Sequence, residues 1–267
     1  MRTRKSDLAH LFRLTDDTGI MEHAIGSIPR REEGYSTDDQ ARALWVCLEW
    51  MDLADPWEQD QLTRLIDTYL SFLLWAQDQE SGWFHNNFAY DRSRESERPS
   101  DDCLARAIWA LALAVVRLDE RERRLAAEYM LEKAWTAAEH MQSPRAWAFG
   151  LAAIRLLKQH EYPAPDHLAN QYATRLIGFY RKQVSHDWRW FEPIVAYSNG
   201  VIPWGLLCWY EECMDWQVLD TALESLDFLT RLMTSIQGHI RPVGNRGWCT
   251  REKRALWDQQ PIDVMKL

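Results

Sequence analysis

The sequence predicts an all-α fold, an (α/α) barrel or toroid built from helical hairpins. Helices that are apolar on nearly every side alternate with helices that carry one apolar stripe, and the alternation recurs at a spacing of about 45 residues. The first kind is typical of a buried inner layer and the second of an outer layer. An irregular helical bundle is the alternative. No strand–helix–strand alternation is present, which argues against Rossmann and TIM-barrel folds.

Four pairs of helices are expected in order along the chain, with the inner helix first in each pair. The pairs span residues 36–54 and 57–79, 100–117 and 119–141, 143–159 and 165–184, and 199–213 and 216–236. In the first outer helix, for example, Leu62, Ile66 and Tyr69 share one stripe at helical spacing. The only strand-like stretch, residues 82–90, favours a short β-hairpin.

Composition and charge exclude several classes of protein. The 267 residues carry 31 Lys and Arg against 40 Asp and Glu, a net charge of −9, whereas a nucleic-acid-binding surface is basic. No apolar run reaches the ~18 residues of a membrane span, and no signal-peptide core follows the first residues. The five cysteines show neither a disulfide framework nor a zinc spacing. We therefore expect a cytoplasmic protein that uses no metal ion and no cofactor.

Carboxylates cluster where loops enter the predicted inner helices. They are Asp38 and Asp39 in the first, Asp101 and Asp102 in the second, and Glu192 before the fourth. Because inner helices of a barrel run parallel, we expect these groups to converge on one concave face. Paired carboxylates serve as acid and base in glycoside hydrolysis. We expect Asp39 and Asp102 to fill those roles, with Glu192 as the third candidate.

Each aspartate pair has a second interpretation as a helix cap. Ser36 followed by Asp39 has the pattern of a capping box, and Ser100 precedes its two aspartates in the same way. Acidic residues in a first turn also interact favourably with the helix dipole. Recurrence at successive inner helices favours catalysis, so both interpretations stay open.

Aromatic and amide side chains beside these carboxylates suit sugar binding. The chain has 15 tryptophans, and flat rings can stack on the apolar faces of sugars while amides bond hydroxyl groups. The sugar-binding candidates on these grounds are Trp83, Phe84, His85, Asn86, Trp190, Phe191 and Asn199. The expected concave face is lined by the tryptophans of this group. A surface position is the alternative for His85.

Six groups of residues follow one another in the order of a known domain. They occupy residues 11–24, 34–44, 100–111, 143–146, 190–193 with 197–200, and 241–245 with 258–262. Together they resemble a bacterial domain of the six-hairpin glycosidase superfamily, which is found fused to or encoded beside glycosyltransferases and mannoside phosphorylases. The resemblance spans residues 8–263. It implies further sugar contacts from Arg145, Arg241, Asn245 and Trp248.

The chain departs from that domain in three ways. Ser198 stands where the domain has an aspartate, and Asp101 stands where it has a glutamate. A six-hairpin barrel needs twelve helices, whereas eight are predicted and a ninth begins near Asp258. The resemblance therefore implies an incomplete barrel of about four hairpins and the start of a fifth. The expected single domain comprises an N-terminal rim segment (1–34), the hairpins (35–257) and the start of a truncated helix (258–267).

These observations predict a glycoside hydrolase-like enzyme that acts on an oligosaccharide or glycoside. One alternative is a non-catalytic glycan-binding or scaffold module that serves a glycosyltransferase, which the missing rim carboxylate favours. Another is a sugar epimerase on the same scaffold, which would need a histidine base at the rim. The open barrel edge further predicts self-association or a partner chain, because apolar patches beyond a few hundred Å² are rare on monomers.

Overall fold

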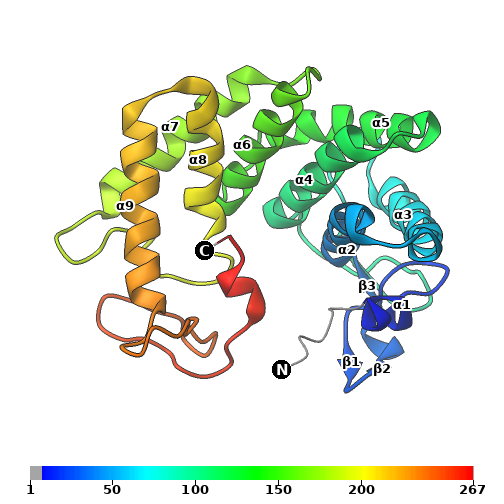
Figure 1. Cartoon of the computed structure of the whole chain (residues 1–267), viewed down its shortest axis with the longest axis horizontal. Coiled ribbons are helices and arrows are strands. Elements are labelled where there is room, and N and C mark those ends of the chain that lie inside the picture. The colour runs from blue at the N-terminus through cyan, green and yellow to red at the C-terminus, as the bar shows by residue number, and fades with distance from the viewer. Residues whose placement is uncertain (1–7, 267) are drawn as a thin grey trace. The chain divides into compact units, whose positions relative to one another are not determined.

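The structure is a computed structural model that describes residues 8–266, and most of these residues are helical (Figure 1). The all-α class and the four helical hairpins agree with the prediction. The chain divides into two compact units, Met1–His140 and Met141–Leu267, each with two hairpins. Within residues 8–266, no helix combines the length and apolar character needed to cross a membrane.

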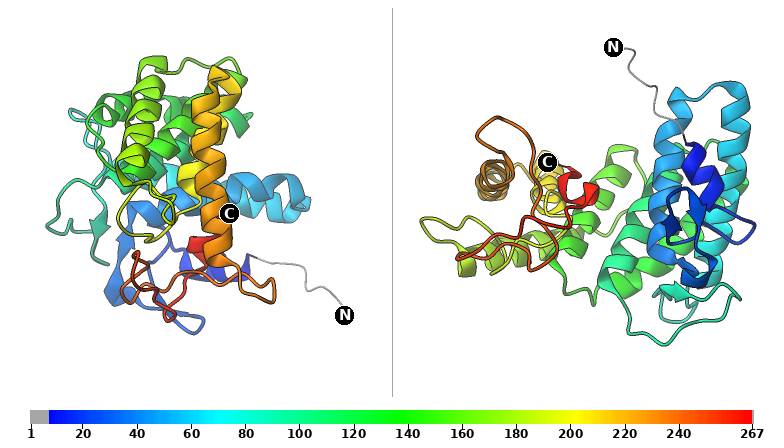
Figure 2. Two further views of the ribbon diagram at one scale, coloured as in Figure 1. Left: turned by 90° about the vertical axis from the view of Figure 1, so that its left-hand side faces the viewer. Right: turned by 90° about the horizontal axis from the view of Figure 1, so that it is seen from below.

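The first unit contains two hairpins, α2 (Thr37–Trp50) with α3 (Pro56–Ala76) and α4 (Asp101–Arg117) with α5 (Arg121–Ala138). Helix α2 packs against both α3 and α4, and Figure 2 shows α2 and α3 side by side. Helix α4 is buried along residues 103–115, whereas α5 buries one stripe, as expected of inner and outer helices. Side-chain oxygens of Ser36, Asp55 and Ser100 cap α2, α3 and α4.

The second unit contains α6 (Pro144–Gln159) with α7 (Asp166–Gln183) and α8 (Val201–Cys213) with α9 (Trp216–Met233). Helix α6 is buried along residues 144–154 and packs closely on α8. The close approach requires Gly205, because a Cβ atom there would overlap the backbone of Ala148. These helices therefore form the core of the second unit.

Short strands join the N-terminal segment to the first hairpin. Strand β3 (Tyr35–Ser36) pairs antiparallel with β4 (Asn87–Phe88), and β1 (Ala24–Ile25) pairs with β2 (Ile28–Pro29). The expectation of a self-contained hairpin over residues 82–90 is wrong, because β4 finds its partner about 50 residues earlier in the chain. A short helix, α1 (Ala9–Leu14), was not expected either.

The buried amide of Gln40, in the first turn of α2, holds the segment that precedes these strands. Its Oε1 accepts from the Ile20 N–H at 2.7 Å, and its Nε2 donates to the Ile20 carbonyl at 2.9 Å. The same Nε2 also lies 3.1 Å from the carbonyl oxygen of Ser36. Gly19 lies so close to this amide that a Cβ atom would overlap it. The N-terminal segment is therefore fixed to α2 by a side chain.

The segment after α9 runs as loops and returns to the start of α8 (Figure 1). A helix was expected from Asp258, and the structure has a short 3₁₀ helix, Pro261–Val264. Gly200, just before α8, allows this return, because a Cβ atom there would lie 2.5 Å from the carbonyl oxygen of Met265. Position 200 therefore requires glycine for packing.

Candidate functional site

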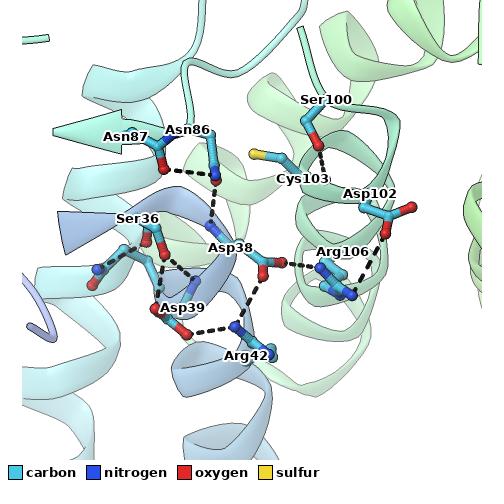
Figure 3. A network of polar contacts seen from close by, with 11 residues as sticks. Ser36, Asp38, Asp39, Arg42, Asn86, Asn87, Ser100, Asp102, Cys103 and Arg106 are labelled. Atoms are coloured by element: carbon cyan, nitrogen blue, oxygen red, sulfur yellow. Dashed lines mark hydrogen bonds and ion pairs between the residues drawn. The ribbon is translucent and has the colours of Figure 1, made fainter. Parts of the chain in front are cut away.

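Two serine caps organise a polar cluster at the starts of α2 and α4 in the first unit (Figure 3). The Ser36 hydroxyl accepts from the Asp39 N–H at 3.2 Å and donates to Asp39 Oδ2 at 2.8 Å. The Ser100 hydroxyl accepts from the Cys103 N–H at 3.3 Å. The capping interpretation therefore holds for both serines, and Asp39 takes part in the first cap.

Two arginines connect the aspartates of this cluster. Asp38 Oδ1 lies 2.7 Å from Arg106 Nη1, and its Oδ2 lies 2.9 Å from Arg42 Nη2. Arg42 also contacts Asp39 Oδ1 at 2.5 Å, and Arg106 lies 3.8 Å from Asp102 Oδ2. Negative and positive groups thus alternate from α2 to α4. Each carboxylate oxygen of Asp38 contacts a guanidinium group within 3 Å, whereas Asp102 lies farther from its arginine, Arg106.

The loop between α3 and α4 brings an amide and a histidine to the same place. Asn86 Oδ1 accepts from the Asp38 N–H at 3.1 Å. The Glu97 carboxylate accepts from the N–H groups of Asn86 and Asn87, at 2.5 and 2.8 Å. His85 lies beside it, with Nδ1 3.6 Å from Glu97 Oε1 and Nε2 3.0 Å from the Asn87 carbonyl. Glu97 therefore orders the turn that carries His85 and Asn86.

The buried Cys103 thiol lies next to this cluster. Desolvation raises the pKa of Cys103 well above its ordinary value, and the nearby carboxylates of Asp38 and Glu97 raise it further. A thiol in this environment stays protonated and is a poor nucleophile. Within residues 8–266, no three His, Cys, Asp or Glu side chains come together as ligands of one metal ion.

In the second unit, Arg145 gathers the residues of the loop before α8. Its buried guanidinium contacts Glu192 Oε2 at 2.9 Å and Asn199 Oδ1 at 3.3 Å. Its Nε donates to the Tyr197 carbonyl at 2.6 Å, and the guanidinium carbon lies 4.6 Å from the centre of the Tyr197 ring. The predicted residues Glu192, Asn199 and Arg145 therefore form one group, with the arginine at its centre.

A buried carboxylate accompanies Ser198, although position 198 itself is not acidic. Ser198 adopts a left-handed backbone conformation (φ 46°), and its N–H donates to Asp263 Oδ1 at 3.2 Å. Desolvation raises the pKa of Asp263, an effect that the N–H donors of Ser198 and Gln260 and the charge of Arg145 partly offset. The 3₁₀ helix thus supplies a carboxylate to the start of α8.

Three predicted sugar-stacking rings lie in the core instead. Phe84 is 2% exposed, and Trp190 and Phe191 are fully buried. Trp190 packs against Phe191 and Phe228. As placed, these three rings offer no face to a ligand, because the surrounding core side chains cover them. Trp83, from the same predicted set, keeps part of its surface.

The remaining candidates belong to the loops after α9. The ring of Trp248 lies 6.1 Å from that of Tyr197, Asn245 N–H donates to the Asp258 carbonyl, and Arg241 is exposed. The carboxylates therefore form two groups, one at α2 and α4 and one around Arg145. That both groups share one concave face stays a prediction.

Several residues of the cluster were missed by the sequence analysis. Arg42 follows Asp38 by four residues and Arg106 follows Asp102 by four, which is the spacing of ion pairs on a helix, so both could have been found. Glu97 carries no comparable signal, because its partners are backbone groups about ten residues away.

One comparison with known proteins, the one with solved structures, bears on the fold. No protein-family model matches the sequence, and the curated proteins contain no match. Among solved structures, the chain is similar to the crystal structure of a sugar epimerase from a ruminal bacterium, with a TM-score of 0.66 and 13% sequence identity. The similarity covers 92% of this chain and 72% of that chain. At this level of identity the likeness shows a shared helical fold.

Proposed function

We propose that this protein is a carbohydrate-active enzyme that hydrolyses glycosidic bonds with carboxylates at the starts of α2 and α4. The observation that carries the proposal is the set of carboxylates at two adjoining helix starts, beside a surface amide and histidine. A fold shared with the structure of a sugar epimerase supports a role in sugar chemistry.

The contacts of the aspartates suggest how the roles divide. Asp38 has a guanidinium on each oxygen, so it suits a positioning role for Arg42 and Arg106. Asp39 and Asp102 are the candidates for the ionised carboxylate that activates water or attacks the anomeric carbon. Asp102 has the longer cation contact, at 3.8 Å from Arg106.

Epimerisation of a sugar is the second candidate, and His85 favours it. The histidine is partly exposed, and Glu97 lies 3.6 Å from its Nδ1. A histidine oriented by a carboxylate suits a general base that removes a proton from a carbon beside a carbonyl. The function of the structurally similar protein is consistent with this candidate.

Incubation with a panel of oligosaccharides and reducing sugars in D₂O, followed by NMR, separates the two reactions. Hydrolysis releases new reducing ends, whereas epimerisation changes the sugar and introduces deuterium at the reacting carbon. For hydrolysis we expect Asp102→Asn to lower kcat by about 10²–10⁴-fold, with His85→Gln retaining turnover. If the protein is an epimerase, we expect His85→Gln to lower kcat by this amount and Asp102→Asn to retain turnover.

Asp55→Asn is the matched control, because it makes the same chemical change at the start of α3, where Asp55 serves as the cap. Asparagine caps a helix about as well as aspartate, so Asp55→Asn should change stability little, and Asp102→Asn leaves the Ser100 cap of α4 in place. Equal activity of Asp102→Asn and the parent would exclude Asp102 from the chemistry. A parent protein that binds sugars without turnover would contradict an enzymatic function.

A further inference from the structure

Short antiparallel pairings give the first unit a polar face next to Ser36. Isolated bridges join Met21 to Tyr35 and Phe88 to Arg94, and β3 pairs with β4. Successive side chains of paired strands point to opposite faces. Met21, Tyr35 and Phe88 are buried on one face, so their neighbours lie on the other. These neighbours are Glu22, Ser36, Asn87 and Glu95.

Backbone hydrogen bonds fix Glu22 on this face. Its N–H donates to the Gly34 carbonyl at 3.0 Å, two residues before Ser36. Because the Ser36 hydroxyl bonds Asp39 at 2.8 Å, Glu22 lies on the side of the sheet that faces the aspartates of α2. Residues 21–22 were not among the predicted site residues, although they fall in the first of the six motifs.

The charges around Glu22 are mostly negative. Asp39 from α2, Glu33 from the 3₁₀ helix Arg31–Glu33 and Glu95 from the segment after β4 face it, and His23 partly offsets their charge. Desolvation is the largest cause that raises the pKa of Glu22, and the charge of Asp39 is the next. Within residues 8–266 no ion pair holds Glu22, whereas Asp39 contacts Arg42.

We propose that Glu22 is the proton donor of the glycoside hydrolysis inferred above, with an ionised aspartate of the same cluster as its counterpart. The inference rests on the proposed function. Acid–base catalysis requires two carboxyl groups in different environments, and here Asp39 contacts Arg42 whereas Glu22 faces other carboxylates. Glu33 fits the role less well, because it already pairs with Arg30 at 2.8 Å.

The proton balance of the step is complete. The Glu22 carboxyl gives its proton to the glycosidic oxygen, and the bond from that oxygen to the anomeric carbon breaks with its electron pair on the oxygen. A water oxygen bonds to the anomeric carbon, and the water proton passes to Asp39 or Asp102. The products are an alcohol and a hemiacetal, and exchange with solvent restores both carboxyl groups.

The test compares Glu22→Gln with the parent on two glycosides of one sugar, an alkyl glycoside and a nitrophenyl glycoside. The alkyl leaving group needs a proton, so its turnover should fall by about 10²–10⁴-fold, while the nitrophenyl glycoside should keep most of its rate. Glu33→Gln is the matched control, because it removes a carboxylate from the same surroundings and should leave both rates nearly unchanged.

A titration of the Glu22 carboxyl carbon by NMR, in the full chain, gives a readout that is independent of turnover. We expect a raised pKa that falls in Asp39→Asn, because that variant removes a like charge. Equal loss on both glycosides, no loss on either, or an ordinary pKa would overturn the role of Glu22 and leave the proposed hydrolysis standing. No hydrolysis by the parent would overturn the proposed function and the donor role together.

Discussion

Arg106 and Arg42 hold the same aspartate from two sides, yet their surroundings differ. The Arg106 side chain is 10% exposed and bridges Asp38 and Asp102, whereas that of Arg42 is 36% exposed. Removing one partner of a buried ion pair leaves a charge without compensation, whereas solvent compensates for an exposed charge. The two arginines therefore contribute differently to stability.

We predict that Arg106→Leu lowers the free energy of unfolding by about 3 kcal/mol, since Asp38 then keeps only its contact with Arg42. Arg42→Leu, the matched control, should cost about 1 kcal/mol or less because that pair is partly solvated. Urea denaturation of both variants measures the difference. Equal destabilisation by the two changes would contradict the distinct burial of these arginines.

At this scale the sequence predicts residue types better than their partners. Asp38, Asp39, Asp102 and Asn86 do form one cluster, as their recurrence before inner helices suggests. Exposure was harder to predict, because a tryptophan or phenylalanine beside polar residues can equally fill a core. Trp190 shows this, since it is fully buried although Arg189 precedes it and Glu192 follows two residues later.

The helices are the elements that the sequence predicts best. Each of the four expected pairs is present with boundaries that shift by a few residues, because apolar periodicity and caps such as Ser36 and Ser100 are local signals. The β3–β4 pairing was missed because its two strands, each two residues long, are separated by the whole first hairpin. A pattern of two residues carries too little periodicity to indicate a partner.

Gly34 offers a test of this pairing. It has a φ of 69°, and a Cβ atom there would overlap the Phe88 carbonyl of β4. We predict that Gly34→Ala costs about 2–3 kcal/mol, from backbone strain and a displaced strand. Gly26→Ala is the control, because Gly26 has a φ of 61° and open space around it. Calorimetry should show a clearly lower Tm for Gly34→Ala than for Gly26→Ala.

At the scale of the whole molecule, Asp263 links stability to pH. Its pKa is raised above the ordinary value of 3.8, so its ionisation is less favourable in the folded state than in the unfolded chain. The stability that the protonated Asp263 carboxyl contributes is therefore lost as the pH rises from 3.8 through the raised pKa of the folded state. We predict that Asp263→Asn gains stability relative to the parent over this interval, and none below it. Unfolding measured from pH 3 to 7 in both proteins checks the difference.

Exposed apolar side chains bear on the state of the molecule in solution. Exposed large apolar side chains occur on helix surfaces and in loops, and some of them gather where two helices of a hairpin meet. Leu53 and Trp57 lie where α2 is followed by the first turn of α3, and Met214 and Trp216 lie where α8 is followed by the start of α9. We predict self-association through these turns, which light scattering can detect. Trp57→Lys should weaken it, and a monodisperse parent monomer would contradict it.

The side-chain amide of Gln40 hydrogen-bonds the Ile20 backbone as a paired β-strand would. Its oxygen accepts from the Ile20 N–H, and its nitrogen donates to the Ile20 carbonyl. The Ile20 amide hydrogen is therefore shielded by a helix rather than by a sheet. Its exchange with deuterated solvent should require the first turn of α2 to open or the N-terminal segment to detach. A single amide signal would thus report on the integrity of the helix start that carries Asp38 and Asp39.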